Sequence, residues 1–138
     1  MDRLQTVSRI MTRDVATVQV DQKLSEVRRL LAASPFHHVP VLRGEHLIGL
    51  VSAADIAPLS LAAYVQDAST VDAHLDESHD LIEVMTPEPV AVEASSSIRE
   101  AAELLAEGQF HALPVIDGAG RLQGILTSTD LIRWFLTL

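Results

Sequence analysis

An internal repeat limits the possible folds of this chain more than any other property of its sequence, because self-similarity at a fixed spacing means that one structural unit is used more than once. Three motifs recur in the same order, the first two at an offset of 74 residues and the third at 75. The extra residue of the second copy lies in a glycine-containing turn, where an insertion costs little. Three matches in the same order, at offsets that differ by a single residue, exceed what chance supplies. The pairs are Ile10–Thr12 with Val84–Thr86, Phe36–Val41 with Phe110–Val115, and Gly49–Asp55 with Gly124–Asp130.

Each copy of the repeat begins with a short strand and a helix. Val15–Val20 and Val90–Val92 are apolar segments that predict the strands. Apolar residues then recur at the i, i+3 and i+6 or i+7 positions of an amphipathic helix. Asp21 and Ser95 precede these helices at equivalent positions and are predicted N-caps, because their oxygens can accept free N–H groups. The two stripes are Leu24, Val27, Leu30 and Leu31, and Ile98, Ala101, Leu104 and Leu105.

A hairpin and a closing helix complete each copy. Apolar segments on both sides of Gly44, and again of Gly118 and Gly120, predict pairs of strands joined by a turn. Apolar stretches after the hairpins predict closing helices at 53 to about 65 and at 128–138. The order in each copy is therefore β-α-β-β-α. The hairpin strands are predicted at 39–42 and 47–51, and at 113–116 and 122–126.

The predicted fold class is α+β, with two β-α-β-β-α repeats packed about a pseudo-twofold axis. One copy of about 55 residues is marginal for independent stability, whereas two related copies can bury their sheet faces against each other. We predict one module over residues 1–138, with repeats at 7–65 and 81–138. Residues 66–80 are polar and acidic without clear periodicity, and are predicted to be a partly helical linker, with a short helix near Leu81–Val84.

The charge of the chain argues against nucleic acid and membranes as partners. The formal net charge is −9 and the pI about 4.9, and such a surface repels polyanions and anionic lipids. No apolar run approaches the roughly 18 residues of a membrane span. The absence of cysteine excludes disulfides, thiolate metal sites and thiol catalysis. The first five residues show no cationic head before an apolar stretch, so no signal peptide is predicted and a cytoplasmic location is expected.

The repeated motifs resemble the CBS (cystathionine-β-synthase) motif. That motif has Met-Thr before the first strand, His-x-h-Pro-Val at the start of the hairpin and Gly-h-h-Ser/Thr-x-x-Asp at the last helix, where h is apolar. The match covers about residues 7–56 and 81–131. In this family, paired repeats form a Bateman module that commonly binds AMP, ADP, ATP or S-adenosylmethionine in clefts between the repeats. The resemblance implies a regulatory, non-catalytic module that binds an adenine nucleoside or nucleotide. Because no second domain is fused in this sequence, the output is expected to pass through a separate effector protein or through a change in a dimer.

The last motif can bind such a ligand by ordinary chemistry. A helix N-terminus offers free N–H groups and a partial positive charge to a phosphate. Ser52 and Thr127 stand at strand-to-helix junctions, where a hydroxyl can cap the helix or donate to a phosphate oxygen. Asp55 and Asp130 follow three residues later, where a carboxylate can accept both hydroxyls of a ribose. The alternative is an ordinary capping pair, but two copies in matched context favour ligand contact.

The resemblance further implies two sites that are crossed between the repeats. The first combines Ser52 and Asp55 with Val90, His111 and Ala112, and the second combines Thr127 and Asp130 with Ala16, His37 and His38. Backbone amides near Ala16 or Val90 would read the adenine. Family members that hold phosphate tightly often carry arginine directly after the motif histidine, where this chain has His38 and Ala112. A neutral histidine is a weak phosphate partner near pH 7, which favours a ligand with little negative charge.

Three other functions are alternatives to this one. An enzyme is disfavoured, because no Gly-x-Ser-x-Gly, P-loop or His-Glu-x-x-His motif occurs and no catalytic residue is predicted. Residues His74–Asp80 could offer nitrogen and oxygen to a metal, but their spacing matches no common zinc pattern. A solvated acidic segment explains them more simply, so no metal ligand is predicted. A structural dimerisation module would need its clefts to be blocked.

The closing helices predict a homodimer. They are apolar around more of their circumference than one core-facing stripe requires. The resemblance implies the same helices, because CBS pairs commonly dimerise through them into a flat disc. Twofold dimers are also the commonest closed assembly. The alternative is that Trp134 and Phe135 only cover the monomer core at a frayed C-terminus. The apolar residues are Ile56, Leu59, Leu61, Ala62 and Ala63 in the first helix, and Leu131, Ile132, Trp134, Phe135, Leu136 and Leu138 in the second.

Overall fold

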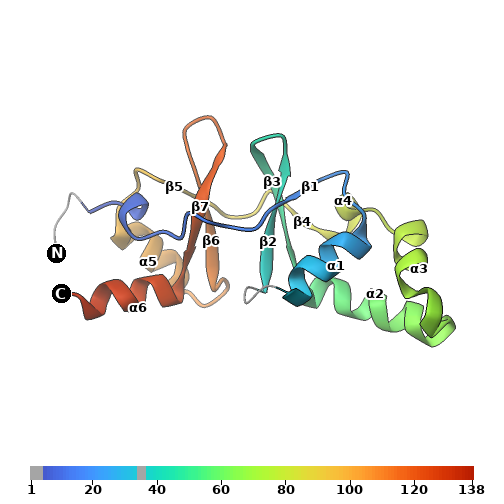
Figure 1. Ribbon diagram of the computed structural model, residues 1–138. Coiled ribbons are helices and arrows are strands. Elements are labelled where there is room, and N and C mark those ends of the chain that lie inside the picture. Colours follow the sequence, from blue (N-terminus) through green and yellow to red (C-terminus); the bar gives the residue numbers. More distant parts are fainter. Residues whose placement is uncertain (1–4, 34–36) are drawn as a thin grey trace. The chain divides into compact units, whose positions relative to one another are not determined.

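The computed structural model describes residues 5–33 and 37–138; Met1–Leu4 and residues 34–36, with Phe36 of the second motif, lie outside the described residues. The fold mixes helices and strands, which confirms the predicted class (Figure 1). The chain separates into two compact units, which are described one at a time. Unit 1 is formed by the described residues of Met1–Val15, Glu45–Leu47 and Val90–Leu138, and unit 2 by those of Ala16–Gly44 and Ile48–Pro89.

Unit 2 is built on a four-stranded sheet in the order β1-β2-β3-β4. β1 is parallel to β2, and β4 is antiparallel to β3. Buried aliphatic side chains of the sheet and of α1 form its core, including the predicted stripe residues Leu24, Val27 and Leu31. The elements are β1 (Val18–Gln19), α1 (Leu24–Ala33), β2 (His38–Arg43), β3 (His46–Ser52), α2 (Ala53–Gln66), η2 (Ala68–Thr70), α3 (Val71–Ser78), α4 (Leu81–Val84) and β4 (Thr86–Pro87).

Unit 1 repeats this plan with three strands in the order β5-β6-β7. β5 is parallel to β6, and β6 is antiparallel to β7. Ala101 and Leu105 of α5 are buried against Leu113 and Leu126 of the hairpin, as the stripe predicts. The elements are η1 (Val7–Arg9), β5 (Val92–Glu93), α5 (Ile98–Ala106), β6 (Ala112–Ile116), β7 (Leu122–Thr127) and α6 (Ser128–Leu136). Both first strands are shorter than their apolar segments predicted.

The compact units do not coincide with the sequence repeats. The first segment of each repeat belongs to the unit that contains most of the other repeat. Thr12 of the first repeat exchanges two backbone hydrogen bonds with Ile125, of 2.8 and 2.9 Å. At the equivalent register of unit 2, Thr86 of the second repeat pairs with Leu50. The Met-Thr motif is thus a strand-pairing segment in both units.

The extra residue of the second repeat lies in the turn between β6 and β7, as the offsets indicate. Gly44 in the shorter turn and Gly120 in the longer one both have positive φ, +65° and +83°, which glycine adopts without strain. The Asp117 carboxylate closes the longer turn by accepting the N–H groups of Ala119 and Arg121, each at 2.9 Å. The backbone hydrogen bond from Arg121 is the main cause that lowers the pKa of Asp117.

The two predicted N-caps were wrong. In α5 the cap is Ser97 rather than Ser95, and its hydroxyl accepts the N–H of Glu100 at 3.1 Å. α1 begins at Leu24, too far along the chain for Asp21 to cap it. Its N-terminal groups bond instead to Asp76, whose carboxylate accepts both the N–H of Ser25, at 2.9 Å, and its hydroxyl, at 2.7 Å. A residue 51 positions away has replaced the local cap.

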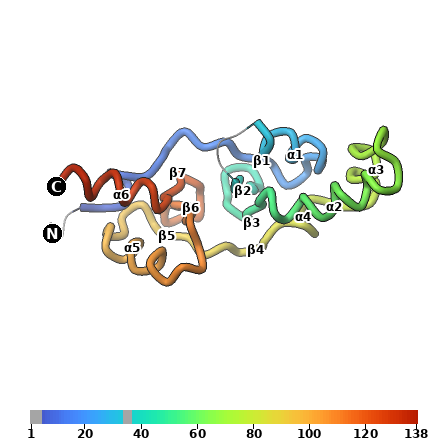
Figure 2. Tube along the Cα trace, turned by 90° about the horizontal axis from the view of Figure 1, so that it is seen from below, coloured from blue at the N-terminus to red at the C-terminus, as the bar shows by residue number. Residues whose placement is uncertain are grey.

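Asp76 lies on α3, so the acidic segment between the repeats is not a plain solvated linker. Figure 2 follows the chain from α2 into α3 and on to α4. Leu75 of α3 is buried in the core of unit 2, with 1% of its surface exposed. On the same helix, Asp72 forms ion pairs with Arg28, at 2.6 Å, and Arg29, at 2.7 Å. The segment therefore docks on α1 through one apolar and several charged contacts.

We expect Asp76→Ala to lower the free energy of unfolding by about 1–2 kcal/mol, because two donors at the start of α1 lose their acceptor. Urea denaturation measures the change. Glu77→Ala is the matched control: Glu77 is the exposed neighbour on the same helix, and its removal should change stability by no more than about 0.5 kcal/mol. Equal losses in the two variants would contradict a specific capping role for Asp76.

Candidate functional site

The N-terminus of α2 carries the first motif pair. Ser52 is the N-cap, and its hydroxyl accepts the N–H of Asp55 at 3.2 Å. The Asp55 carboxylate accepts the N–H of Ser52 in return, through Oδ2 at 2.8 Å. This reciprocal arrangement is a capping box. The carbonyl of His37 accepts the N–H of Ala53 at 3.0 Å, so the motif histidine is joined to the same helix end through its backbone.

The N-terminus of α6 repeats this geometry in unit 1. Thr127 is the N-cap and accepts the N–H of Asp130 at 3.1 Å, while Asp130 Oδ2 accepts the N–H of Thr127 at 2.9 Å. The carbonyl of His111 accepts the N–H of Ser128 at 3.2 Å. Both copies of Ser/Thr-x-x-Asp are therefore complete capping boxes, as expected if the motif is an ordinary capping pair.

The capping boxes limit what each helix end can offer a ligand. Of the first three N–H groups of α2, those of Ala53 and Asp55 are already bonded, and the same holds for Ser128 and Asp130 in α6. The second N–H group of each helix, on Ala54 or Thr129, shows no hydrogen bond to the residues that the structure describes. One backbone donor and the helix dipole then remain for an anion at each end.

The two carboxylates differ in a way that the sequence analysis missed. The hydroxyl of Thr12 donates to both oxygens of Asp130, at 3.2 and 3.3 Å. Asp130 is a buried residue, with 9% of its surface exposed. Thr86 occupies the equivalent register beside Leu50, yet across the described ranges no hydrogen bond joins Thr86 to Asp55. The only signal for this contact was the repeated Met-Thr motif, whose threonine had no assigned role.

The structure places the remaining predicted site residues on one unit or the other. The side chains of His37 and His111 are exposed, His38 and Ala112 are half-buried at the starts of β2 and β6, and Ala16 and Val90 are exposed just before β1 and β5. Ser52 and Asp55 lie in the same unit as His37. Thr127 and Asp130 lie in the same unit as His111. The crossed groupings combine residues of different units and stay a prediction.

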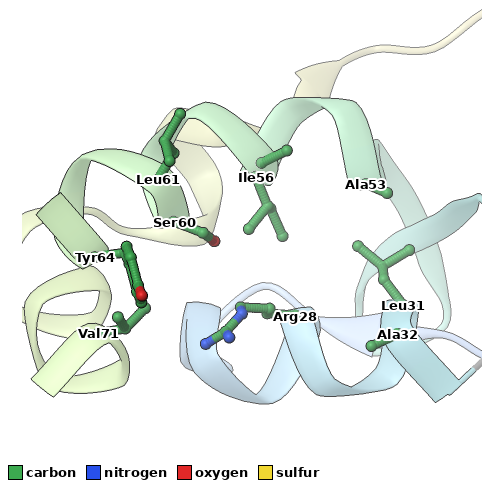
Figure 3. A pocket seen from close by; sticks show the side chains of 10 residues that line it. Arg28, Leu31, Ala32, Ala53, Ile56, Ser60, Leu61, Tyr64 and Val71 are labelled. Carbon is green, nitrogen blue, oxygen red and sulfur yellow. The ribbon is translucent and has the colours of Figure 1, made fainter. Parts of the chain in front are cut away.

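A groove of about 470 Å³ in unit 2 was not anticipated from the sequence. Figure 3 shows Ile56, Ser60 and Tyr64 of α2 facing Arg28 and Leu31 of α1 across it. The Ser60 hydroxyl is buried and has no hydrogen-bond partner among the described residues. The groove contains none of the predicted ligand-binding residues. Its lining is Arg28, Leu31, Ala32, Ala53, Ile56, Ala57, Ser60, Leu61, Tyr64 and Val71.

A cluster of histidine and carboxylate side chains would indicate a metal site, and a long apolar helix a membrane span, in the described ranges 5–33 and 37–138. No three His, Asp or Glu side chains there converge into a group that could hold a metal ion. The segment His74–Asp80 instead uses Leu75 and Asp76 to dock on unit 2. No helix in the described ranges has the length and apolar character needed to cross a bilayer.

Comparison with known proteins identifies the class to which this fold and its repeated capping motif belong. The sequence pattern of the CBS domain matches residues 7–61 and 81–137, which agrees with the two repeats found in the sequence. The chain belongs to the CBS domain family and contains two copies of the domain.

Related sequences carry this pair in different settings. The chain is 27% identical to a CBS domain-containing protein of Dictyostelium discoideum, over 91% of this chain and 88% of the relative. It is 32% identical to homoserine O-acetyltransferase of Methanocorpusculum labreanum, over 91% of this chain but 23% of that enzyme. The chain thus spans about a quarter of the length of the enzyme that it matches.

Solved structures share the fold along nearly the whole chain. CBSX2 of Arabidopsis thaliana in complex with AMP superposes with a TM-score of 0.79 at 29% identity, covering 96% of this chain and 97% of CBSX2. The cytosolic domain of the Mg²⁺ channel MgtE in complex with ATP superposes with a TM-score of 0.74 at 26% identity, covering 94% of this chain and 48% of that one.

Proposed function

We propose that this chain is a regulatory module that binds an adenosine ligand (AMP, ADP, ATP or S-adenosylmethionine) and has no catalytic activity of its own. One observation carries the proposal: a capping box with an aspartate three residues after the cap stands at the start of both closing helices. Similar solved structures hold AMP in CBSX2 and ATP in MgtE. Output would pass to a separate effector protein, and the cytoplasmic location stays a prediction.

The chemistry of the proposed site follows from the helix ends. A carboxylate in the first turn accepts the two ribose hydroxyls, and the free N–H of the second helical residue faces a phosphate or another electronegative group. Ser52 and Asp55 would act with Val90, His111 and Ala112, and Thr127 and Asp130 with Ala16, His37 and His38. Without arginine after the motif histidine, phosphate charge adds little, so the nucleoside part supplies most of the affinity.

A thermal-unfolding screen separates this function from its rivals. A ligand that binds only the folded state stabilises it, by about 2.7 kcal/mol at a concentration one hundred times its Kd. Adenosine, AMP, ADP, ATP and S-adenosylmethionine are tested beside guanosine nucleotides and Zn²⁺. Stabilisation by adenine compounds alone supports the sensor. Stabilisation by Zn²⁺ alone supports a metal protein, and no shift with any compound supports a structural dimerisation module.

We also propose a homodimer in which α2 and α6 of one chain contact a second copy of the chain. The outer faces of these helices are apolar and open: Leu61 is 62% exposed and Phe135 68%. Trp134 fits this surface less well, because it is half-buried and its Nε1 donates to Gln5 Oε1 at 2.8 Å. The other exposed apolar residues are Tyr64, Val65, Ile132, Leu136 and Leu138.

Sedimentation should show a dimer that Leu61→Glu and Phe135→Glu together convert to a monomer, because burying two carboxylates in an apolar contact costs far more than the contact supplies. Gln109→Glu is the control, since Gln109 is exposed outside both helices. A 15.0 kDa wild-type monomer would exclude the dimer. If the double variant still forms a dimer, the interface lies on another surface.

A further inference from the structure

We propose that only one of the two motif carboxylates binds ribose: Asp55 contacts the ligand, whereas the oxygens of Asp130 are occupied by the hydroxyl of Thr12. This inference rests on the proposed function, since it concerns how the two copies of one ligand motif are used. The two copies have the same sequence pattern and the same capping box. They differ in whether a threonine hydroxyl already donates to the carboxylate.

The acceptor capacity of each carboxylate decides the difference. Asp55 Oδ2 accepts the N–H of Ser52, and no described group donates to its Oδ1. Asp130 accepts the N–H of Thr127 through Oδ2 and the hydroxyl of Thr12 through both oxygens. A ribose must displace the Thr12 hydroxyl from Asp130, whereas at Asp55 it meets an open oxygen. Breaking one hydrogen bond to form another gives little net gain.

The Thr12 hydroxyl is held in place by its backbone. Thr12 donates its N–H to the carbonyl of Ile125 and accepts the N–H of Ile125 in return. The same segment is anchored by Val7, which is fully buried in the core of unit 1, and by Arg13, which donates to the carbonyl of Ser8 at 2.8 Å. Thr12 therefore presents its side chain to Asp130 from a segment paired with Ile125, and moving it away would disturb this pairing.

Thr86 has the same register but a different setting. It pairs with Leu50 as Thr12 pairs with Ile125. However, Thr86 is exposed, and a proline follows it where Arg13 follows Thr12. Because residue type and register are matched, Thr86 provides an internal control for the hydroxyl of Thr12.

Calorimetric titration with AMP tests the proposal through its stoichiometry. We expect the wild type to bind one AMP per chain, Asp55→Ala to weaken that binding roughly 10- to 150-fold and Asp130→Ala to leave it unchanged. Thr12→Val removes only the hydroxyl and should raise the stoichiometry to two. Thr12→Ser, which keeps the hydroxyl, and Thr86→Val should both stay at one.

Two sites in the wild type, or one site that disappears in Asp130→Ala and survives in Asp55→Ala, would overturn the inference while leaving the proposed function standing. An unchanged stoichiometry in Thr12→Val would overturn it as well. Absence of binding in every variant, with AMP and with each of the other adenine compounds of the screen, would instead overturn the proposed function and this inference with it. A ligand-free measurement checks the contact itself: Thr12→Val should destabilise the wild type more than Thr86→Val, and the difference should vanish in an Asp130→Ala background.

Discussion

Gly124→Ala is expected to destabilise the protein by about 3 kcal/mol, the upper end of the range for overpacking. A Cβ at this position would lie 2.5 Å from the carbonyl oxygen of Thr12, a backbone atom of the segment that pairs with Ile125. This segment must shift, and the two hydrogen bonds between Thr12 and Ile125 are weakened with it. Urea denaturation measures the loss.

Gly49→Ala is the control for this variant, because Gly49 is the equivalent residue of the first repeat. The added Cβ would meet the side chain of Met85, which is unbranched and can change its rotamer. We expect a loss of about 1 kcal/mol or less. Equal losses in Gly124→Ala and Gly49→Ala would contradict the view that the backbone of the Met-Thr segment is the rigid neighbour in unit 1.

Asp55→Ala should weaken adenosine-ligand binding by about 1.5–3 kcal/mol, the range for hydrogen bonds to a charged group, which is roughly a 10- to 150-fold rise in Kd. The carboxylate is the proposed acceptor of both ribose hydroxyls. The fold should survive, because Ser52 still caps α2 through the N–H of residue 55. Equilibrium binding of AMP to the folded variant measures the change.

Charge alone must be excluded as the cause of that effect. Glu77→Ala removes one negative charge from an exposed position of α3 in the same unit, and it should leave the Kd within about twofold. Asp55→Asn keeps one side-chain oxygen and should fall between the wild type and Asp55→Ala. If Glu77→Ala weakens binding as much as Asp55→Ala, then Asp55 is not a ligand contact.

Most of the fold could be predicted because its signals are local. The stripe of Leu24, Val27 and Leu31 is buried as predicted, and the extra residue lies in the predicted turn. The sequence missed contacts between distant residues. Asp76 accepts the N–H of Ser25, at the start of α1, from 51 residues further along the chain. Thr12 and Asp130, which share a hydrogen bond, are 118 residues apart. Propensity and periodicity carry no information about such pairs.

The candidate site was predicted in part for the same reason. The pairs Ser52 with Asp55 and Thr127 with Asp130 were found because their members are three residues apart on one helix turn. Their capping role could be foreseen from that spacing, as could the repetition of the motif. The inequality of the two aspartates could not, because it depends on a side chain that another strand brings to only one of them.

Calorimetric titration of the unmodified chain with AMP, ATP, S-adenosylmethionine and, as a control, GMP tests directly whether this CBS pair binds an adenosine ligand. We expect saturable binding of at least one adenine compound, with no heat beyond dilution for GMP. Binding should persist when the phosphate is removed, because the ribose and adenine supply most of the affinity. Absence of binding by every adenine compound to folded protein, or equal binding of GMP and AMP, would contradict the proposal that this CBS pair senses an adenosine ligand.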